Sequence, residues 1–236
     1  MRGTCMGHSL ITCKIAKEGM TPKQMESEAS IMRKLAYHKN VIQLLDWNSL
    51  EEPYLLIMEF MSYGTLRSFV QNHKDELSDD PELQQQFTIT SYHIALGMEH
   101  LRSKMVVHCD LALRNILVGR FPWEIKVAEF GLARDLTRMR SRRSSRKKQP
   151  KERVPLRWYP PEYFRSNYYS FKGDVWAFGI VLWELQTHQI MQDCWLDPYT
   201  SRPSFKDIVE ILENTVESDG DYVHIDDQRI ANGDGM

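Results

Sequence analysis

The chain has 236 residues, of which 42% are hydrophobic and 26% are charged, so it can bury the core of one large domain or two small ones. The cysteines have neither metal-ligand spacing nor a disulfide pattern, which indicates reduced thiols in a cytosolic setting. They are Cys5, Cys13, Cys109 and Cys194. No run of apolar residues is long enough for a membrane span, and the first residues lack the apolar stretch of a signal peptide. We therefore expect a chain that is neither secreted nor inserted, unless a span lies outside it and makes it the cytosolic part of a membrane protein.

The net charge of −2 hides a strong local asymmetry. Residues 138–153 carry nine basic side chains and one acidic side chain. A solvated loop is the favoured interpretation of such a run. Contact with nucleic acid has no support from interleaved aromatic residues, so we expect no nucleic-acid partner.

The first third of the chain predicts two strands with a helix between them. Residues 8–14 and 53–60 are short apolar runs typical of strands. Thr21, Pro22 and Gln24 form the start signal of a helix, with a cap, a proline at the first position and a capping box. Its apolar face is defined by Met25, Met32 and Leu35.

Glu28 lies on this apolar face, where an unpaired carboxylate is costly to bury. Lys14, at the end of the preceding strand, is the candidate partner. The alternative is that Glu28 lies at the edge of the face, in contact with water.

The rest of the chain predicts mainly helices, with short strands between residues 106 and 130. The expected helices are 82–105, 174–187, which is apolar on all sides, and 204–217, which is amphipathic. This order indicates an α+β fold with a small sheet-containing lobe and a larger helical lobe. The expected boundaries are 1–61, 62–217 and an acidic, disordered tail at 218–236.

The stretch 106–115, VVHCDLALRN, places a carboxylate, a guanidinium and an amide within six positions. It resembles the catalytic loop of protein kinases, H-R-D-L-x-x-x-N. Glu129-Phe130-Gly131 resembles the D-F-G metal loop that follows it. Further motifs in the family order are PPE at 160–162, DVWAFG at 174–179 and RPSF at 202–205. The resemblance covers residues 9 to about 215 and implies the bilobal protein-kinase fold.

Two further stretches resemble tyrosine kinases in particular. The residues before Asn115, Ala-Leu-Arg, are similar to the A-A-R of receptor tyrosine kinases, and 155–158 resembles the segment that receives the substrate tyrosine. Residues 27–45 are similar to the same region of the fibroblast and platelet-derived growth factor receptors. The chain thus resembles the kinase domain of a receptor tyrosine kinase.

The resemblance implies roles for the polar residues of a phosphoryl-transfer site. Lys14 would hold the α- and β-phosphates of ATP and pair with Glu28. Asp110, with Arg114 beside it, would orient the tyrosine hydroxyl and accept its proton. Asn115 and Glu129 would hold Mg²⁺, a cation that prefers oxygen ligands.

The resemblance also implies the adenine site and the structural residues. Met58 would be the gatekeeper, followed by an adenine-binding hinge at 59–61. The remaining ATP contacts expected are Glu59, Met61 and Leu117, with Phe60 between the two hinge residues. The expected structural residues are His108, Phe130 and Met32 in a hydrophobic stack, Asp174 at the start of the buried helix, and the ion pair of Glu162 with Arg202.

Five departures from the family pattern predict impaired catalysis. The Gly-rich phosphate loop is missing, Glu129 replaces aspartate, and Cys109 replaces the arginine that grips an activation-loop phosphate. Residues 132–157 contain no tyrosine, and the path between residues 184 and 202 is short, as if a segment were deleted. A catalytically inactive pseudokinase acting as a binding scaffold, and a truncated product that does not fold stably, are the alternatives to an active kinase.

Two segments carry candidate phosphorylation sites. Ser141, Ser144 and Ser145 lie in the basic run, in a context suited to a basophilic serine kinase, or are part of a plain solvated loop. Tyr222 lies in an acidic segment and, once phosphorylated, would suit an SH2-type partner, although an incidental tail tyrosine is the favoured interpretation. The other expected partners are ATP and protein substrates, at the cytosolic side of the plasma membrane if the chain is part of a receptor.

Overall fold

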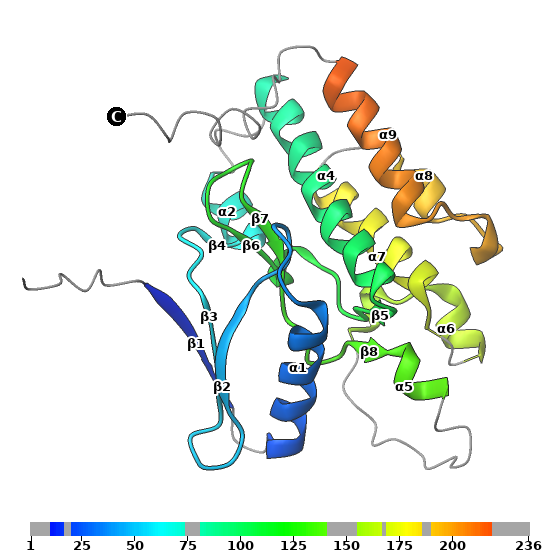
Figure 1. Cartoon of the computed structure of the whole chain (residues 1–236). Coiled ribbons are helices and arrows are strands. Elements are labelled where there is room, and N and C mark those ends of the chain that lie inside the picture. The colour runs from blue at the N-terminus through cyan, green and yellow to red at the C-terminus, as the bar shows by residue number, and fades with distance from the viewer. Residues whose placement is uncertain are drawn as a thin grey trace, which may run out of the picture.

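The computed structural model describes residues 10–16, 20–73, 81–140, 155–166, 169–185 and 190–218. Figure 1 shows a smaller part, with one sheet and helix α1, beside a larger part in which helices α4, α7 and α9 dominate. This arrangement confirms the expected bilobal α+β fold. The serines at 141, 144 and 145 and Tyr222 lie outside the described residues, as does the predicted tail beyond Ser218.

The sheet of the smaller part has three antiparallel strands in the order β1-β3-β2. They are β1 (Ile11–Ile15), β2 (Leu44–Asn48) and β3 (Leu55–Glu59). Strand β1 and the central strand β3 were predicted, whereas the outer strand β2 was missed because its alternation is interrupted by a register shift between Leu44 and Asp46. Among the described residues β1 is an edge strand, with β3 as its neighbour and Lys14 opposite Leu56.

Helix α1 (Pro22–Leu35) begins where the sequence predicts. The Thr21 side chain accepts a hydrogen bond from the backbone N–H of Gln24, whose side chain accepts one from the backbone N–H of Thr21. Such a cap stabilises a helix by about 1 kcal/mol. The buried face of α1 includes Glu28, which is only 2% exposed, so this carboxylate does not lie in water at the edge.

The larger part contains the predicted helices with small shifts of their ends. Its helices are α2 (Leu66–Asn72), α4 (Pro81–Ser103), α5 (Leu136–Arg140), α6 (Pro161–Ser166), α7 (Phe171–Glu184), α8 (Met191–Cys194) and α9 (Phe205–Ser218). Helix α7 begins before its predicted start because the Ser170 hydroxyl accepts a hydrogen bond from the N–H of Lys172 and so caps the helix there. Helices α4 and α9 lie side by side (Figure 1).

Short strands and 3-10 turns connect the helices and carry the polar motifs. The strands are β4 (Gly64–Thr65), β5 (Val106–Val107), β6 (Ile116–Val118), β7 (Ile125–Val127) and β8 (Arg134–Asp135). The 3-10 turns are Leu113–Asn115, Leu156–Trp158 and Tyr199–Ser201. Strands β4, β6 and β7 form one small sheet, and β5 pairs with β8. These elements bring the catalytic-loop motif and the metal-loop motif into neighbouring positions.

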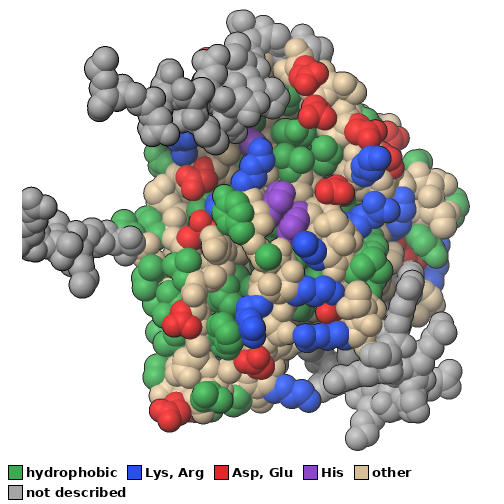
Figure 2. Space-filling model, viewed as in Figure 1, with side chains coloured by type: hydrophobic (Ala, Val, Ile, Leu, Met, Phe, Trp, Pro, Cys, Tyr) green, Lys and Arg blue, Asp and Glu red, His purple; other side chains and the backbone are tan. Residues whose placement is uncertain are grey.

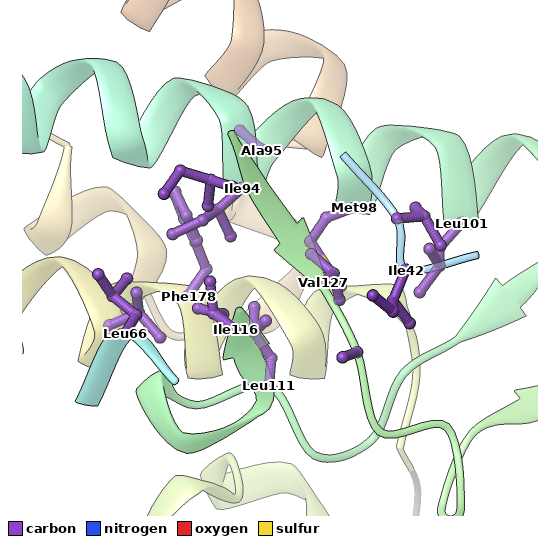
Figure 3. Packing of buried hydrophobic residues seen from close by; sticks show 14 of the residues in the cluster. Ile42, Leu66, Ile94, Ala95, Met98, Leu101, Leu111, Ile116, Val127 and Phe178 are labelled. Carbon is purple, nitrogen blue, oxygen red and sulfur yellow. The ribbon is translucent and has the colours of Figure 1, made fainter. Parts of the chain in front are cut away.

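A continuous hydrophobic core joins these elements. Ile94, Met98 and Leu101 on α4 pack towards Val127 of β7, and Phe178 of α7 closes the other side (Figure 3). All of these side chains are at most 1% exposed. The core therefore fixes β6 and β7, and with them the catalytic-loop motif that precedes β6 and the metal-loop motif that follows β7.

The surface differs in character between the two parts. Figure 2 shows hydrophobic side chains gathered over the sheet and acidic ones over α9. The exposed apolar residues of the smaller part include Leu10, Ile11, Ile15, Leu45 and Leu50. Within the described ranges, no helix has the length and apolar character needed to cross a membrane.

Candidate active site

The ion pair expected between Lys14 and Glu28 is present. Lys14 Nζ of β1 lies 2.8 Å from Oε1 and 3.0 Å from Oε2 of Glu28 on α1. Burial by itself would lower the pKa of Lys14, but the carboxylates of Glu28 and Glu129 outweigh it and raise that pKa. Lys14 is therefore a cation held at a fixed place between the sheet and the helix.

Glu129 reaches the same lysine from the metal-loop motif. Its Oε2 lies 2.7 Å from Lys14 Nζ, and its side chain is 45% exposed. The residue has φ 66°, in the left-handed region that non-glycine residues rarely adopt. Lys14 thus bridges two carboxylates that are 101 positions apart in the chain, Glu28 and Glu129.

The catalytic-loop motif folds into a compact hydrogen-bonded turn. The Asp110 carboxylate accepts a hydrogen bond from Arg114 Nη2 and one of 2.8 Å from Asn115 Nδ2. Asn115 Nδ2 also donates to the Asp110 backbone carbonyl at 2.7 Å. Because the amide nitrogen of Asn115 makes both bonds, its oxygen remains as a ligand for a cation.

The side chain of Asp174, on α7, anchors the backbone of this loop by hydrogen bonds. Its carboxylate accepts the N–H groups of His108 at 2.8 Å and Cys109 at 3.0 Å. Complete burial raises the pKa of Asp174 to about 7, against the opposing effect of these two hydrogen bonds. Cys109 has φ 64° and is 1% exposed, in a small apolar cluster with Tyr159 and Tyr169. The thiol thus lies in a hydrophobic setting.

The rings of His108 and Phe130 are in contact, as expected, but edge to face rather than stacked. Their centroids lie 5.4 Å apart, and Met32 and Phe130 belong to the same hydrophobic core. His108 Nε2 lies 3.0 Å from the Ala128 carbonyl, and its Nδ1 accepts the N–H of Asp110. Burial lowers the pKa of His108, which fits a neutral ring that donates at one nitrogen and accepts at the other.

The predicted adenine-binding hinge, residues 59–61, begins at the last residue of β3. Met58 and Met61 are buried, whereas Phe60 is 45% exposed. Leu117, on β6, is partly buried against the hydrophobic core. These residues come from both parts of the molecule, as a nucleotide site between two lobes requires.

Lys126 of β7 was not predicted and anchors the hinge. Its Nζ lies 2.8 Å from Glu59 Oε1, which also accepts the N–H of Gln43 at 2.8 Å. Lys126 is only 5% exposed. A single lysine in an otherwise apolar strand was the sequence signal for a buried ion pair.

A second cross-link that was not predicted joins α1 to the segment after the metal-loop motif. Lys34 Nζ lies 2.6 Å from Asp135 Oδ1 and 3.1 Å from the Thr137 hydroxyl. Burial by itself would raise the pKa of Asp135, but the hydrogen bonds from Lys34 and Thr137 outweigh it and lower that pKa. The carboxylate is therefore held in its charged form.

The ion pair expected between Glu162 and Arg202 is also present. The guanidinium donates two hydrogen bonds, of 2.8 and 2.9 Å, to the two carboxylate oxygens. The Arg202 side chain is fully buried. It links α6 to the chain that leads into α9.

The oxygen ligands present suit magnesium in type. Mg²⁺ usually takes one or two carboxylates or amides and completes its shell with phosphate oxygens and water. Asn115 and Glu129 supply such oxygens, and the N–H of Ala128 donates to the Asn115 carbonyl, so the two residues lie close in the fold. Within the described residues no group of three or more His, Cys, Asp or Glu side chains could hold a metal by itself.

Comparison with known proteins agrees with this geometry. A family model described as protein tyrosine and serine/threonine kinase matches residues 4–189. The chain belongs to this kinase family. The match ends within the short path between residues 184 and 202.

Relatives in the receptor tyrosine kinases align over almost the whole chain. Fibroblast growth factor receptor homolog 1 of Drosophila melanogaster is 28% identical over 281 residues, which covers 97% of this chain and 37% of the relative. Fibroblast growth factor receptor 1 of Pleurodeles waltl is 29% identical over 263 residues, covering 92% of this chain and 32% of the relative. The chain thus spans about a third of the length of these relatives.

Both alignments are longer than the 236 residues of the chain. The relatives therefore carry residues that have no counterpart here. This agrees with the expectation, drawn from the short path between residues 184 and 202, that the kinase pattern is internally shortened.

Proposed function

We propose that this chain is a protein tyrosine kinase domain that transfers the γ-phosphate of ATP to tyrosine with reduced efficiency. The observation that carries the proposal is that these polar side chains lie together between the two parts of the molecule. Lys14 pairs with Glu28 and Glu129, and Asp110 accepts a hydrogen bond from Asn115. These are the cation, the base and the oxygen ligands that phosphoryl transfer requires.

Each polar residue has a distinct task in this proposal. Lys14, kept charged and oriented by Glu28, binds the phosphate oxygens of the nucleotide. Asp110 orients the tyrosine hydroxyl and accepts its proton, while Arg114 and Asn115 keep its carboxylate in place. ATP with Mg²⁺ supplies the transferable phosphoryl group and a cation that offsets its charge, for which Asn115 and Glu129 offer the ligands.

The side chain of Glu129 supports reduced efficiency. Its Oε2 is hydrogen-bonded to Lys14, so this cation competes with Mg²⁺ for the carboxylate. It is also one methylene longer than the aspartate of the family motif, and Mg²⁺ tolerates little change in ligand geometry. Both effects weaken the positioning of the phosphoryl group.

A pseudokinase that serves as a binding scaffold is the second candidate. The ion pair of Glu129 with Lys14 favours it, because it neutralises the phosphate-binding cation from within the chain. In that case the chain acts through its surfaces, and Tyr222, if phosphorylated, would recruit an SH2-type partner at the cytosolic side of a membrane.

A thermal melt with and without millimolar ATP and Mg²⁺ separates the two candidates. A ligand at 100 times its Kd adds about 2.7 kcal/mol to the free energy of unfolding. For a chain of this size we expect a Tm increase of roughly 5–11 °C. A cooperative melt without a magnesium-dependent increase would support the scaffold.

A transfer assay on a tyrosine peptide then tests the kinase reading directly. The Asp110→Asn variant keeps the hydrogen bond to Asn115 and the fold, but it cannot accept the hydroxyl proton. We expect it to bind nucleotide like the parent chain and to lose phosphoryl transfer. Unchanged transfer by this variant would assign the signal to a contaminating kinase.

A further inference from the structure

The C-terminal ends of α1 and α4 form a basic patch on the face of the molecule shown in Figure 2. Residues 33–40 and 100–104 contain five Lys and Arg side chains and no Asp or Glu. The rings of His38 and His100 stack with their centroids 4.4 Å apart, and His100 Nε2 donates to the Leu35 carbonyl at 2.7 Å. These contacts hold the two segments together, so their cations gather on one surface around the histidines. The cations of the basic patch are Arg33, Lys34, Lys39, Arg102 and Lys104.

Four of these five cations are exposed, namely Arg33, Lys39, Arg102 and Lys104. Among the described residues, none of the four forms an ion pair or donates a hydrogen bond from its side chain. The Arg33 guanidinium lies over the Trp47 ring at 4.8 Å. Lys34 differs from the others, because its Nζ lies 2.6 Å from Asp135 Oδ1. The basic patch thus presents cations that can bind anionic groups of a partner.

The surroundings of the patch are consistent with a positive potential. Burial, and then the charges of three neighbours, lower the pKa of His38 to about 4. These neighbours are His100, Lys39 and Lys126. Two acidic residues border the patch: Glu99 of α4 is partly buried, and Asp207 of α9 accepts the N–H of Ser204 at 2.7 Å. The exposed cations outnumber them, so the surface remains positive.

An exposed aromatic side chain lies beside these cations. Tyr37, in the connection between α1 and β2, is 68% exposed and directly precedes His38 and Lys39. Tyrosine, with an apolar ring and a polar hydroxyl, is favoured where a protein meets the headgroup region of a membrane. Peptides are recognised in grooves or along strand edges, whereas this patch consists of side chains that project from two helix ends and a loop. A flat layer of anionic headgroups can contact all of them at once.

We propose that the basic patch binds the surface of an anionic membrane, with its lysines and arginines at the lipid headgroups and Tyr37 at the same level. The occupant is a bilayer leaflet that contains phosphatidylserine or a similar anionic phospholipid. Each Lys or Arg near such a surface strengthens binding about fivefold. The patch contains none of the residues of the proposed catalytic site, so the inference does not depend on catalytic competence.

Co-sedimentation of the whole chain with lipid vesicles tests the proposal. The probe is vesicles of phosphatidylcholine with about 30 mol% phosphatidylserine, and the control is vesicles of phosphatidylcholine alone. We expect the chain to bind the anionic vesicles at least about tenfold more tightly, with an affinity that falls as ionic strength rises.

Substitutions of single residues assign the binding to the patch. Lys39→Gln and Lys104→Gln should each weaken binding to the anionic vesicles about fivefold, whereas Lys39→Arg and Lys104→Arg should retain it. Tyr37→Ser should also weaken it, because it removes the aromatic contact. Lys23→Gln is the matched control, an exposed lysine at the opposite end of α1, about 15 Å from Arg33 at 1.5 Å per residue. Melts of all variants verify that each is folded.

The basic run at 138–153 needs a control of its own, since its charges would also attract anionic lipids. Lys147→Gln removes one positive charge from that run. If Lys147→Gln weakens binding and Lys104→Gln does not, the run binds the vesicles and the proposal is overturned.

Three other results would overturn the proposal. The first is equal binding to the two kinds of vesicle, and the second is an equal loss in the Lys23→Gln and Lys104→Gln variants. The third is binding of a polyglutamate peptide, dependent on Lys39 and Lys104, without binding of the vesicles, which would make the partner an acidic polypeptide. The melt shift with ATP and Mg²⁺ should be the same in the patch variants and the parent chain, so the failure of this proposal is distinguishable from that of the proposed function.

Discussion

Replacement of Arg202 by leucine should cost a large share of the stability of this chain. The guanidinium donates to both carboxylate oxygens of Glu162, to the Leu196 carbonyl at 2.9 Å and to the Lys172 carbonyl at 3.0 Å. It also lies over the Trp176 ring at 5.0 Å. These contacts tie together α6, α7 and the short path that leads into α9.

The magnitude follows from the burial of the pair. The side-chain exposure is 0% for Arg202 and 10% for Glu162, so solvent screens the ion pair little. Removing one partner of a buried pair costs about 3–5 kcal/mol, because the other charge is left buried and unpaired. We expect a loss of about 4 kcal/mol from a total stability on the order of 5–15 kcal/mol.

Urea and thermal unfolding of the parent chain and the Arg202→Leu variant measure this loss. The expected Tm decrease is roughly 8–16 °C at 2–4 °C per kcal/mol. Arg165→Leu is the matched control, because Arg165 pairs with Asp197 at 3.1 Å with side-chain exposures of 65% and 51%. An exposed pair of this kind contributes at most about 1 kcal/mol.

A double variant, Arg202→Leu with Glu162→Leu, checks the physical cause. If an unpaired buried carboxylate produces the loss, removing it should recover at least about 1 kcal/mol relative to the single variant. A loss of less than 1 kcal/mol in Arg202→Leu, or no recovery in the double variant, would refute the reasoning.

Three other predictions concern the ion pairs and the histidines of the smaller part. Glu129→Asp shortens the side chain that pairs with Lys14, so the variant should bind ATP with Mg²⁺ up to about fivefold more tightly, as measured by calorimetry. The limit is fivefold because a half-exposed ion pair contributes at most about 1 kcal/mol. Weaker binding would contradict this prediction. Burial, and then the charge of His100, lowers the pKa of His38 to about 4. As the pH falls, His38 is therefore protonated in the unfolded chain before it is protonated in the folded chain. Stability should therefore decrease from about pH 6.5 to pH 4, by about 1–2 kcal/mol after allowance for solvent screening, and a His38→Gln variant should flatten this slope in urea titrations. Lys34→Met removes the ion pair with Asp135 and should speed amide hydrogen exchange in α5, and unchanged exchange would show that the pair does not hold that segment.

Much of the fold was predictable because local signals agree with it. The capping box at Thr21 placed the start of α1, and the periodicity of residues 82–105 predicted α4 to within two residues at each end. Helix α2 was missed: it has only seven residues, and its cap, the Thr65 hydroxyl that accepts the N–H of Ser68, is a weak signal in a short turn.

The site residues were predictable in identity but not in all of their contacts. Motif order assigned Asp110 and Asn115 to one loop, and the buried position of Glu28 on an apolar face required a cation. The contacts of Lys126 with Glu59 and of Lys34 with Asp135 join residues 67 and 101 positions apart. No local pattern encodes such pairs, because they depend on how the two parts pack.

By itself, the sequence determined the kinase family, the order of the elements and the residues that form the proposed site. It did so because polar groups at fixed spacing and the periodicity of apolar residues are local properties of a chain. Only the tertiary structure decided that Glu129 is paired with Lys14 and that Cys109 packs against Tyr159 and Tyr169. These facts depend on the packing of elements distant in the chain around one core, where burial and charge are set by neighbours in space.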